Sequence, residues 1–482
     1  MTTKPQRTKI LIVGAGPTGL GAAWRLQELQ QDTDWLIVDA SEKPGGLASS
    51  VVDKEGFTWD LGGHVLFSHY DYFDQVLNEC MSGEWVEHQR EAWVWVRDQF
   101  IPYPFQNNIW RLPPPDLVSC LEGLLSVHNK PAMPLRSDSF EDWIYRNFGT
   151  GLAHIFFIPY NYKVWAYHPK KVSACWIQER VATVDLSRIL KNLVLRKDEL
   201  GWGPNSVFRF PLKGGTGVIW KRVAEQLPQN RLLMGRALTR VNAKLRQAEL
   251  SDGTLIEYEY MISCIPLNSL VKMVEGVNLD VTPEKFLYSS TNLIGIGLEG
   301  KPPDELKTKC WMYFVEDQFP FYRVTVFSNY SQFNVPKPGE QWSLLCEVSE
   351  SADKSVDHAT LKEDVIAALQ EIKIIDDHKI VSTWQTRLEH GYPTPFLGRD
   401  QIIEPLNNKL TEHGIFSRGR FGAWKYEVSN QDHSFMQGVE AIDHILFGTE
   451  ELTYFQPSAV NSGKKRPRRK PLQREAKLRS EK

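Results

Sequence analysis

Lys9-Ile-Leu-Ile-Val13 and, directly after it, Gly14-Ala-Gly16-Pro-Thr-Gly19 are the residues that decide the fold of this chain. A short apolar run of this kind predicts a buried parallel strand, and residues 20–29 then predict a helix. The first glycine allows a tight turn, the second lets a pyrophosphate approach the backbone, and the third lets helix and strand pack closely. Trp35-Leu-Ile-Val-Asp39 predicts a second strand that ends in an acid able to bind a ribose hydroxyl. Together these elements predict a dinucleotide-binding site.

A second stretch, Gly295-Ile-Gly297-Leu-Glu-Gly300, fits the same glycine spacing. Here Lys301-Pro302-Pro303 follows, and two prolines cannot continue into the helix whose N-terminus must face the phosphate. We therefore expect Ser290–Leu298 to be a strand with close backbone packing, not a second nucleotide site.

More glycines lie just past the acid at position 39. The sequence Gly45-Gly46-Leu47 at this place resembles FAD enzymes of the amine-oxidase and reductase type rather than NAD dehydrogenases. Two glycine turns in a hairpin are the alternative interpretation.

Elements of a nucleotide domain recur along the chain, in residues 213–227, 236–241, 261–266 and 415–446. A single domain with two insertions explains this order better than tandem domains. The expected fold class is α/β, with a Rossmann-like FAD-binding domain, an inserted helical domain and an inserted antiparallel β-sheet domain. The expected segments are 1–107, 206–285 and 401–455 for the FAD-binding domain, 108–205 for the helical insertion with a mobile flap, 286–400 for the substrate sheet, and 456–482 for a disordered basic tail.

Charge is spread unevenly over the 482 residues. The whole chain carries −3, but residues from Gly463 to Lys482 hold ten Lys or Arg and two Glu, so the rest of the chain carries −11. A basic tail on an acidic body favours a solvated terminus over a nucleic-acid-binding domain. An aromatic content of 11% suits a protein with both a large core and ligand clefts.

The six cysteines are scattered, without a CxxC pair, and no histidines cluster in the sequence. This pattern predicts a reduced intracellular protein without a metal site. No apolar stretch approaches the roughly 18 residues of a membrane span, and no cleavage site for a signal peptide stands out. We expect a soluble protein of the cytoplasm.

Several longer motifs make a resemblance specific. Gly62-Gly63-His64-Val-Leu-Phe67-Ser-His69, Tyr103-Pro104-Phe105-Gln106, Arg323 to Tyr330, His390-Gly391-Tyr392-Pro393 and Arg418 to Phe435 look like UDP-galactopyranose mutase. The match is to the larger eukaryotic type and runs from about residue 8 to residue 455.

The resemblance implies an isomerase that interconverts UDP-galactopyranose and UDP-galactofuranose, an activity of galactofuranose biosynthesis. In this family N5 of reduced FAD attacks the anomeric carbon and expels UDP, a flavin–galactose iminium forms and recloses, and no net redox occurs. NADPH is the expected reductant and would have to use the same cleft. A homo-oligomer is compatible with the sequence.

The resemblance to UDP-galactopyranose mutase also implies roles for individual residues of this sequence. Arg180 and Arg323 would bind the diphosphate, and His64 would lie with its backbone near flavin N5. The remaining substrate residues would be Tyr103, Phe105, Gln106, Phe156, Asn161, Trp165, Asn205 on a mobile flap, Trp311, Tyr313, Tyr330, Tyr392 and Tyr426. The cofactor residues would be Gly14, Gly16, Thr18, Gly19, Asp39, Gly45, Gly46, Leu47, Gly63, His64, Val241, Gly419, Arg420, Asn430, Gln431 and Ser434.

Two features depart from the family pattern. Ile158 stands where fungal relatives tend to carry Arg, and the basic tail has no counterpart. Two other classes stay open: an amine oxidase or desaturase-like oxidoreductase sharing only the cofactor domain, and a flavin-fold binding protein that has lost the cofactor. The intact Gly14, Gly16, Gly19 and Asp39 argue against the last.

Overall fold

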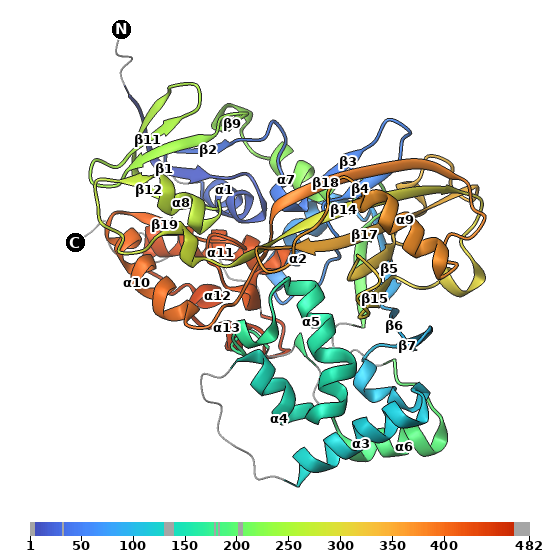
Figure 1. Cartoon of the computed structure of the whole chain (residues 1–482). Helices are drawn as coiled ribbons and strands as arrows, with labels where there is room; N and C mark the ends of the chain where they lie inside the picture. The colour runs from blue at the N-terminus through green and yellow to red at the C-terminus, as the bar shows by residue number, and fades with distance from the viewer. Residues whose placement is uncertain are drawn as a thin grey trace.

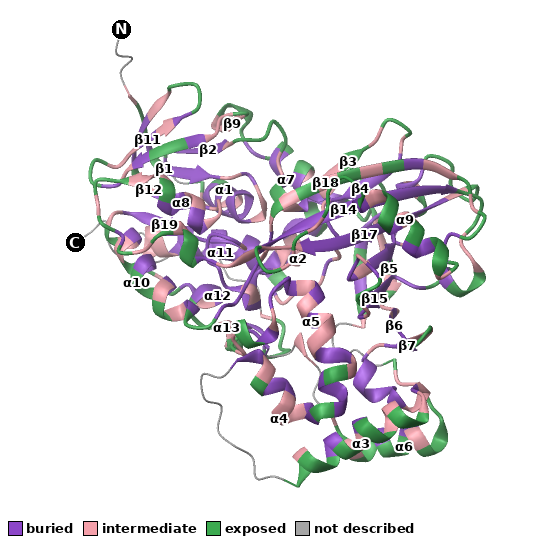
Figure 2. Ribbon diagram, in the orientation of Figure 1, coloured by how far each residue is buried: buried purple, intermediate pink, exposed green. Residues whose placement is uncertain are grey.

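The computed structural model describes residues 5–30, 33–129, 139–177, 180–181, 184–200 and 206–466. Figure 1 shows three parts: one built on the strands near the N-terminus, one on the long strands β14, β17 and β18, and a helical part that extends below both. The two sheets and the helices against them hold most of the buried residues (Figure 2). Within the described residues, no helix combines the length and apolar character that crossing a membrane requires.

The first sheet is the dinucleotide fold that the glycine motif predicts. Its parallel centre runs β12, β1, β2, β9, and β19 pairs in parallel with β12. The strands at 9–13 and 35–39 are confirmed. The strands of this sheet are β1 (Gln6–Val13), β2 (Trp35–Asp39), β9 (Leu232–Met234), β10 (Leu238–Asn242), β11 (Gln247–Leu250), β12 (Leu255–Ser263), β13 (Val274–Glu275) and β19 (Ile415–Ser417).

Two helices from opposite ends of the sequence pack against each other beside this sheet. A Cβ on Gly21 in α1 would lie 2.3 Å from the Phe435 carbonyl oxygen, and one on Gly438 in α11 would lie 1.9 Å from that of Thr18. Only glycine permits this approach, which ties the C-terminal helix to the nucleotide motif. The helices are α1 (Pro17–Leu29), α2 (Asp71–Met81), α7 (Gly217–Glu225), α8 (Leu267–Met273), α10 (Arg399–Glu412), α11 (Gln431–Phe447), α12 (Leu452–Phe455) and α13 (Pro457–Val460).

The second sheet has the strand order β18-β14-β17-β16-β15-β6-β7. Its β14 confirms the strand expected at 290–298, since Gly295 and Gly297 lie under the rings of Trp59 and Phe57 and not beside a helix. The strands are β6 (Ala92–Val96), β7 (Gln99–Pro102), β14 (Tyr288–Glu299), β15 (Trp311–Phe314), β16 (Arg323–Val326), β17 (Gln341–Glu350) and β18 (Ile380–Pro393), with α9 (Leu361–Glu371) against them.

This sheet differs from the expected insertion in two respects. The pair β15–β6 is parallel, whereas the other pairs are antiparallel. Residues 92–102 had been expected in the FAD-binding segment that ends at 107, but they complete the second sheet. The reason is that strand pairing joins segments far apart in sequence, which a linear division cannot show.

The helical part and the short strands complete the fold. A π-helical turn, Ala153–Phe157, leads directly into α5, which carries candidate substrate residues. The helices are α3 (Pro114–His128), α4 (Phe140–Leu152), α5 (Ile158–Trp165) and α6 (Leu186–Leu195). The short strands form the pairs β3 (Ser50–Val52) with β4 (Thr58–Asp60), and β5 (Trp85–Gln89) with β8 (Val207–Pro211).

The first residues of the expected disordered tail are ordered, which corrects that expectation for 456–466. Val460 is fully buried, and Asn461 donates a hydrogen bond to the Glu427 carbonyl oxygen at 2.8 Å. The Arg466 N–H donates to the His69 carbonyl oxygen at 2.9 Å, and Lys465 forms an ion pair with Asp74. The sequence did not predict this packing because the residues that follow are strongly basic. Only two residues before them, Val460 and Asn461, make the apolar and amide contacts.

Candidate functional site

One cavity of about 1030 Å³ lies where the three parts meet. Its lining comes from the β1–α1 turn, the loop after β4, helix α5, strands β15 to β18, and the loop between β19 and α11. Because the nucleotide motif and the aromatic residues of both insertions face the same space, this cavity is the candidate functional site.

The glycine turn forms one end of the cavity. Gly14 has a φ of +107°, and a Cβ on Gly19 would lie 1.8 Å from the Gly14 carbonyl oxygen, so both need glycine. At Gly16 the nearest atom to an added Cβ is 3.8 Å away, which leaves room for a ligand at the start of α1. Asp39 accepts hydrogen bonds from the Ala15 and Ser41 N–H groups at 2.6 and 2.7 Å, and burial raises its pKa.

The other candidate cofactor residues either line the cavity, support the glycine loops beside it or lie buried behind the lining. Gly45, with a φ of +119°, donates its N–H to the Ala15 carbonyl oxygen at 2.9 Å and so joins the two glycine loops. Gly419 packs on the Thr18 side chain, and Val241 is buried in β10 between Ala248 and Val274, behind the cavity lining. Those in the lining are Gly14, Gly16, Thr18, Asp39, Gly46, Leu47, Gly63, His64, Arg420, Asn430, Gln431 and Ser434.

These residues fit a flavin dinucleotide. The open space at Gly16, the start of α1 and the acid at the end of β2 offer a pyrophosphate and a ribose their usual partners. The second helix N-terminus, that of α11, also reaches the cavity through Gln431 and Ser434.

Six arginines of the described residues line the cavity, and three of them, Arg180, Arg323 and Arg420, are residues that the sequence predicts for the site. Arg180 lies over the ring of Tyr426 and donates from Nη2 to the Glu427 carbonyl oxygen at 3.1 Å. Arg420 lies over the ring of Tyr392, 4.9 Å from its centre, and burial lowers its pKa. Arg323 pairs with Glu347 through two hydrogen bonds of 2.7 Å. Fixed cations in a partly buried cavity are suited to a polyanionic ligand such as a diphosphate.

Tyrosines fill the space between these cations. The ring centres of Tyr103 and Tyr160 lie 5.7 and 5.2 Å from that of Tyr313. Tyr392 and Tyr426 lie around Trp165, at 5.8 and 4.8 Å. Burial raises the pKa values of Tyr103, Tyr160 and Tyr392, so their hydroxyls stay protonated and can donate hydrogen bonds.

The expected uracil pocket is an aromatic stack at the edge of the cavity. Phe156 in the lining stacks on Phe105 at 4.6 Å and on Tyr160 at 5.2 Å. Asn161 uses its amide nitrogen to bond the Phe157 carbonyl oxygen at 2.7 Å and lines the cavity as well. Four candidates, namely Phe105, Gln106, Trp311 and Tyr330, are buried behind the lining. Asn205 lies outside the described residues.

His64 is buried between two of the arginines. Burial lowers the pKa of His64 to about 3, with the charges of Arg420 and Arg323 acting in the same direction. The ring is therefore neutral near pH 7 and cannot serve as a cationic acid there.

The lining residues that the sequence did not predict include Arg90, Tyr160, Tyr322 and Glu347. Arg90 lies over the Trp311 ring, 4.8 Å from its centre. A charged residue inside the apolar run Trp342–Val348 was a signal that could have pointed to Glu347.

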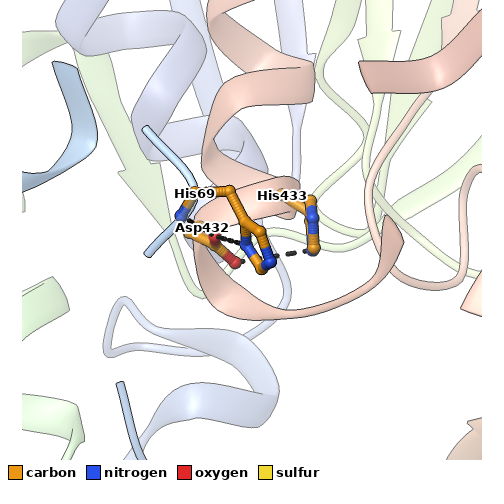
Figure 3. Close-up of side chains that lie close together, drawn as sticks. All are labelled: His69, Asp432 and His433. Atoms are coloured by element: carbon orange, nitrogen blue, oxygen red, sulfur yellow. Dashed lines mark hydrogen bonds and ion pairs between the residues drawn. The ribbon is translucent and has the colours of Figure 1, made fainter. Parts of the chain in front are cut away.

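Next to the cavity loop, the fold brings together two histidines that the sequence keeps apart (Figure 3). His69 Nδ1 lies 2.7 Å from Asp432 Oδ2, and His433 Nδ1 lies 3.5 Å from Asp432 Oδ1. The three side chains have the donor types of a metal site. The two histidine rings also stack on each other, with their centres 4.6 Å apart and 26° between their planes.

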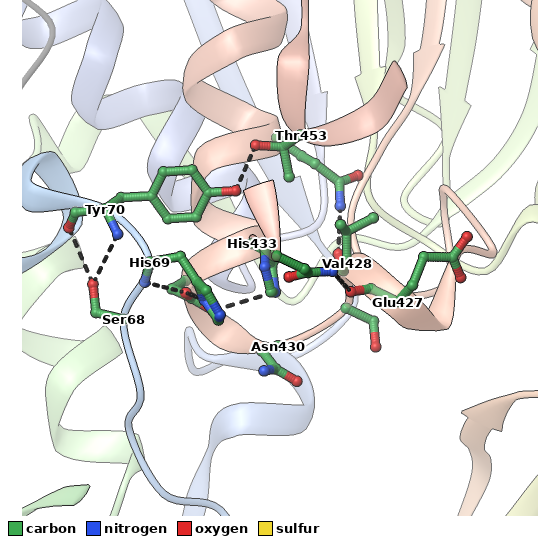
Figure 4. Close-up of polar contacts among 12 residues, drawn as sticks. Ser68, His69, Tyr70, Glu427, Val428, Asn430, His433 and Thr453 are labelled. Atoms are coloured by element: carbon green, nitrogen blue, oxygen red, sulfur yellow. Dashed lines mark hydrogen bonds and ion pairs between the residues drawn. The ribbon is translucent and has the colours of Figure 1, made fainter. Parts of the chain in front are cut away.

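Within this cluster, burial lowers the pKa of His433 to about 4. Figure 4 shows it among further polar contacts, which include Tyr70 with Thr453 at 2.7 Å and residues of the loop from Glu427 to Asn430. The cluster thus ties the segment after His64 to the first turn of α11.

Comparison with known proteins defines the class. The family model of flavin containing amine oxidoreductases matches residues 17–424, and the chain belongs to this family. A crystal structure of reduced UDP-galactopyranose mutase is 50% identical, with a TM-score of 0.91 over 94% of this chain and 99% of that chain. Within the flavin family the chain therefore belongs to the UDP-galactopyranose mutases, and it is an enzyme of the isomerase class.

More distant structures share the fold alone. Wild-type putrescine oxidase bound to putrescine is 15% identical with a TM-score of 0.64, covering 92% of this chain and 99% of that chain. A fatty acid isomerase from P. acnes is 12% identical with a TM-score of 0.60, covering 91% and 99%. The family and fold class expected from the sequence are confirmed.

Proposed function

We propose that this protein interconverts UDP-galactopyranose and UDP-galactofuranose. The observation that supports this most is one cavity whose lining combines a dinucleotide turn, several arginines and a set of tyrosines. A UDP-sugar needs cations for its diphosphate, a flat apolar surface for uracil and hydroxyl donors for the sugar. The cavity offers all three next to the expected cofactor.

Arg180 and Arg323 would bind the diphosphate. Arg323 uses Nε and Nη2 for Glu347, so its Nη1 group is the part left to meet an anion. Arg180 is held by the Glu427 carbonyl oxygen and by Asn430 Oδ1 at 3.3 Å, neither of which neutralises its charge. As UDP leaves the sugar, negative charge grows on the diphosphate, and fixed cations stabilise that charge most in the transition state.

The tyrosines would complete the anion site, since Tyr313, Tyr392 and Tyr426 line the cavity and carry hydroxyl groups. Phe156 in its stack with Phe105 would hold uracil by ring stacking, with Asn161 and Trp165 beside it.

FAD would bind at the glycine turn, with Asp39 toward its ribose. Bound there in its reduced form, the cofactor would supply a nucleophile for the anomeric carbon, with no net oxidation of the sugar. NADPH would be the reductant and would enter through the same cavity. His64, neutral near pH 7, would contribute its position and backbone rather than a charge.

An anaerobic assay tests the proposal. The holoenzyme, reduced with dithionite, should convert UDP-galactofuranose to UDP-galactopyranose, and the oxidised holoenzyme should not. Failure of the reduced enzyme to convert the substrate would contradict the proposal. Rapid flavin reduction by an amine, without UDP binding, would instead favour an oxidase.

A further inference from the structure

Glu347 lies in the middle of β17, where this strand passes the cavity, and it is 1% exposed. Its two carboxylate oxygens accept hydrogen bonds from three different residues. The Arg323 guanidinium donates twice at 2.7 Å, the Tyr322 hydroxyl donates at 2.6 Å, and the Gly63 N–H donates at 3.0 Å. Such a set of donors is what a buried carboxylate requires to remain charged.

The pair with Arg323 fixes the direction of that guanidinium. Burial works to lower the pKa of Arg323, but the negative charge of Glu347 more than offsets it, and the pKa is raised. The two parallel hydrogen bonds allow one orientation of the planar guanidinium, in the plane of the carboxylate. With 19% of its side chain exposed, Arg323 faces the cavity from this fixed position.

The bond to Gly63 connects the same carboxylate to a second wall of the cavity. A Cβ on Gly63 would lie 3.0 Å from Thr325 Oγ1, 3.1 Å from Glu347 Oε1 and 3.3 Å from Arg323 Nη2. The loop that carries His64 is therefore packed directly on the Glu347–Arg323 pair. A movement of Glu347 would change both the arginine and the loop.

We propose that Glu347 is a positioning residue for the mutase reaction: it holds the Arg323 guanidinium and the Gly63 peptide in one fixed geometry on either side of the cavity. This inference rests on the proposed function, in which Arg323 binds the diphosphate. Glu347 does not bind the substrate in this scheme, because its oxygens are occupied and a carboxylate repels a diphosphate.

The two effects of Glu347 on an anion oppose each other. Its negative charge disfavours the diphosphate in the ground state, whereas its hydrogen bonds orient Arg323 for the transition state. Glu347→Gln removes the charge and leaves one oxygen for the donor groups of Arg323, Tyr322 and Gly63, which two oxygens share in wild type. Turnover should then fall at least about tenfold, while the Kd of UDP stays within about threefold of wild type or becomes tighter.

The experiment compares the holoenzymes of wild type, Glu347→Gln, Arg323→Ala and the double variant. Turnover is measured on the reduced enzyme and UDP affinity by calorimetry. In the Arg323→Ala background, Glu347→Gln should lower turnover by a clearly smaller factor than in wild type, because the part of its effect that runs through the arginine is already lost and only its bond to Gly63 remains. Glu249→Gln is the control: it weakens a glutamate–arginine pair, that with Arg240, outside the cavity lining and should leave turnover within about twofold.

Three results would overturn the inference. One is wild-type turnover in Glu347→Gln, and another is additive losses in the double variant. The third is a parallel loss of turnover and UDP affinity together with flavin content, which indicates damage to the fold. If Glu347→Gln does not fold, Glu347→Asp keeps the charge, but its shorter side chain cannot reach Arg323, Tyr322 and Gly63 together, and turnover should fall while UDP binding is retained. Wild type that lacks mutase activity would instead contradict the proposed function itself.

Discussion

The guanidinium carbon of Arg180 lies 4.7 Å from the centre of the Tyr426 ring, and both side chains line the cavity. Arg180 lies between α5 and α6 of the first insertion, whereas Tyr426 lies between β19 and α11, so the two meet only in the folded chain. The ring supports the cation from one side and leaves its other side to a ligand. The proposed anion site is therefore formed by two parts of the fold, the helical insertion and the segment between β19 and α11.

Replacing either diphosphate arginine should impair the reaction strongly. Arg180→Ala and Arg323→Ala should each lower turnover of the reduced enzyme at least about 10²-fold, because a fixed charge at the leaving diphosphate is lost. The measurement is conversion of UDP-galactofuranose under anaerobic conditions. Arg97→Ala is the control, since Arg97 is an exposed partner of Asp116 outside the cavity lining. Wild-type rates in both cavity variants would show that the phosphate assignment is wrong.

The ring and the hydroxyl of Tyr426 should contribute separately to UDP binding. Tyr426→Phe keeps the ring over Arg180 and should weaken UDP binding about 3–10-fold, the value of one hydrogen bond. Tyr426→Ala should weaken it further because the cation–π contact is lost as well. Tyr454→Phe is a matched control, since Arg418 lies 4.2 Å from the centre of that ring outside the cavity lining. Equal effects of the Phe variants at positions 426 and 454 on UDP affinity would contradict the assignment.

The glycine turn allows cofactor binding to be separated from folding. Gly16→Ala places a methyl group where no atom lies within 3.8 Å, so the apoprotein should melt within a few degrees of wild type. FAD affinity should nevertheless fall at least about tenfold, because the methyl blocks the approach of the pyrophosphate. Gly19→Ala brings a Cβ to 1.8 Å from a carbonyl oxygen and should destabilise the apoprotein as well. Flavin titration of the apoprotein and thermal melting measure the two effects.

The parts of this fold that could be predicted from sequence are those determined by local geometry. The turn Gly14–Gly19 and the acid at 39 depend on residues close in sequence, and the prolines at 302 and 303 correctly excluded a second nucleotide site. The family resemblance supplied Arg180 and Arg323, which neither spacing nor composition distinguishes from surface arginines.

What the sequence could not show depends on pairing between distant segments. Residues 92–102 join the second sheet only because β15 lies beside them. His69 and Asp432 are 363 positions apart, and no periodicity signals their contact. Glu347 gains its role from Gly63 and Arg323, two residues on different parts of the fold. Val460 and Asn461 are ordered because they pack on the loop that carries Glu427, although a basic tail follows.

A buried acid should make stability depend on pH. Asp60 accepts hydrogen bonds from Ser50 and Thr216, but burial outweighs these bonds and raises the pKa of Asp60 from 3.8 to about 7. Between about pH 4 and pH 7 the folded protein therefore retains a proton that the unfolded chain has released. The contribution of Asp60 to the free energy of unfolding should decrease as pH rises through this window.

Asp60→Asn, neutral in both states, lacks this dependence. Its free energy of unfolding relative to wild type should increase by roughly 1–4 kcal/mol between pH 5 and pH 7.5, measured by urea denaturation of the apoprotein. Asp376→Asn, at an exposed position, is the control and should follow the wild-type curve. Parallel curves for Asp60→Asn and wild type would mean that Asp60 ionises in the folded protein as readily as in the unfolded chain. The hydrogen bonds from Ser50 and Thr216 would then compensate for its burial in full.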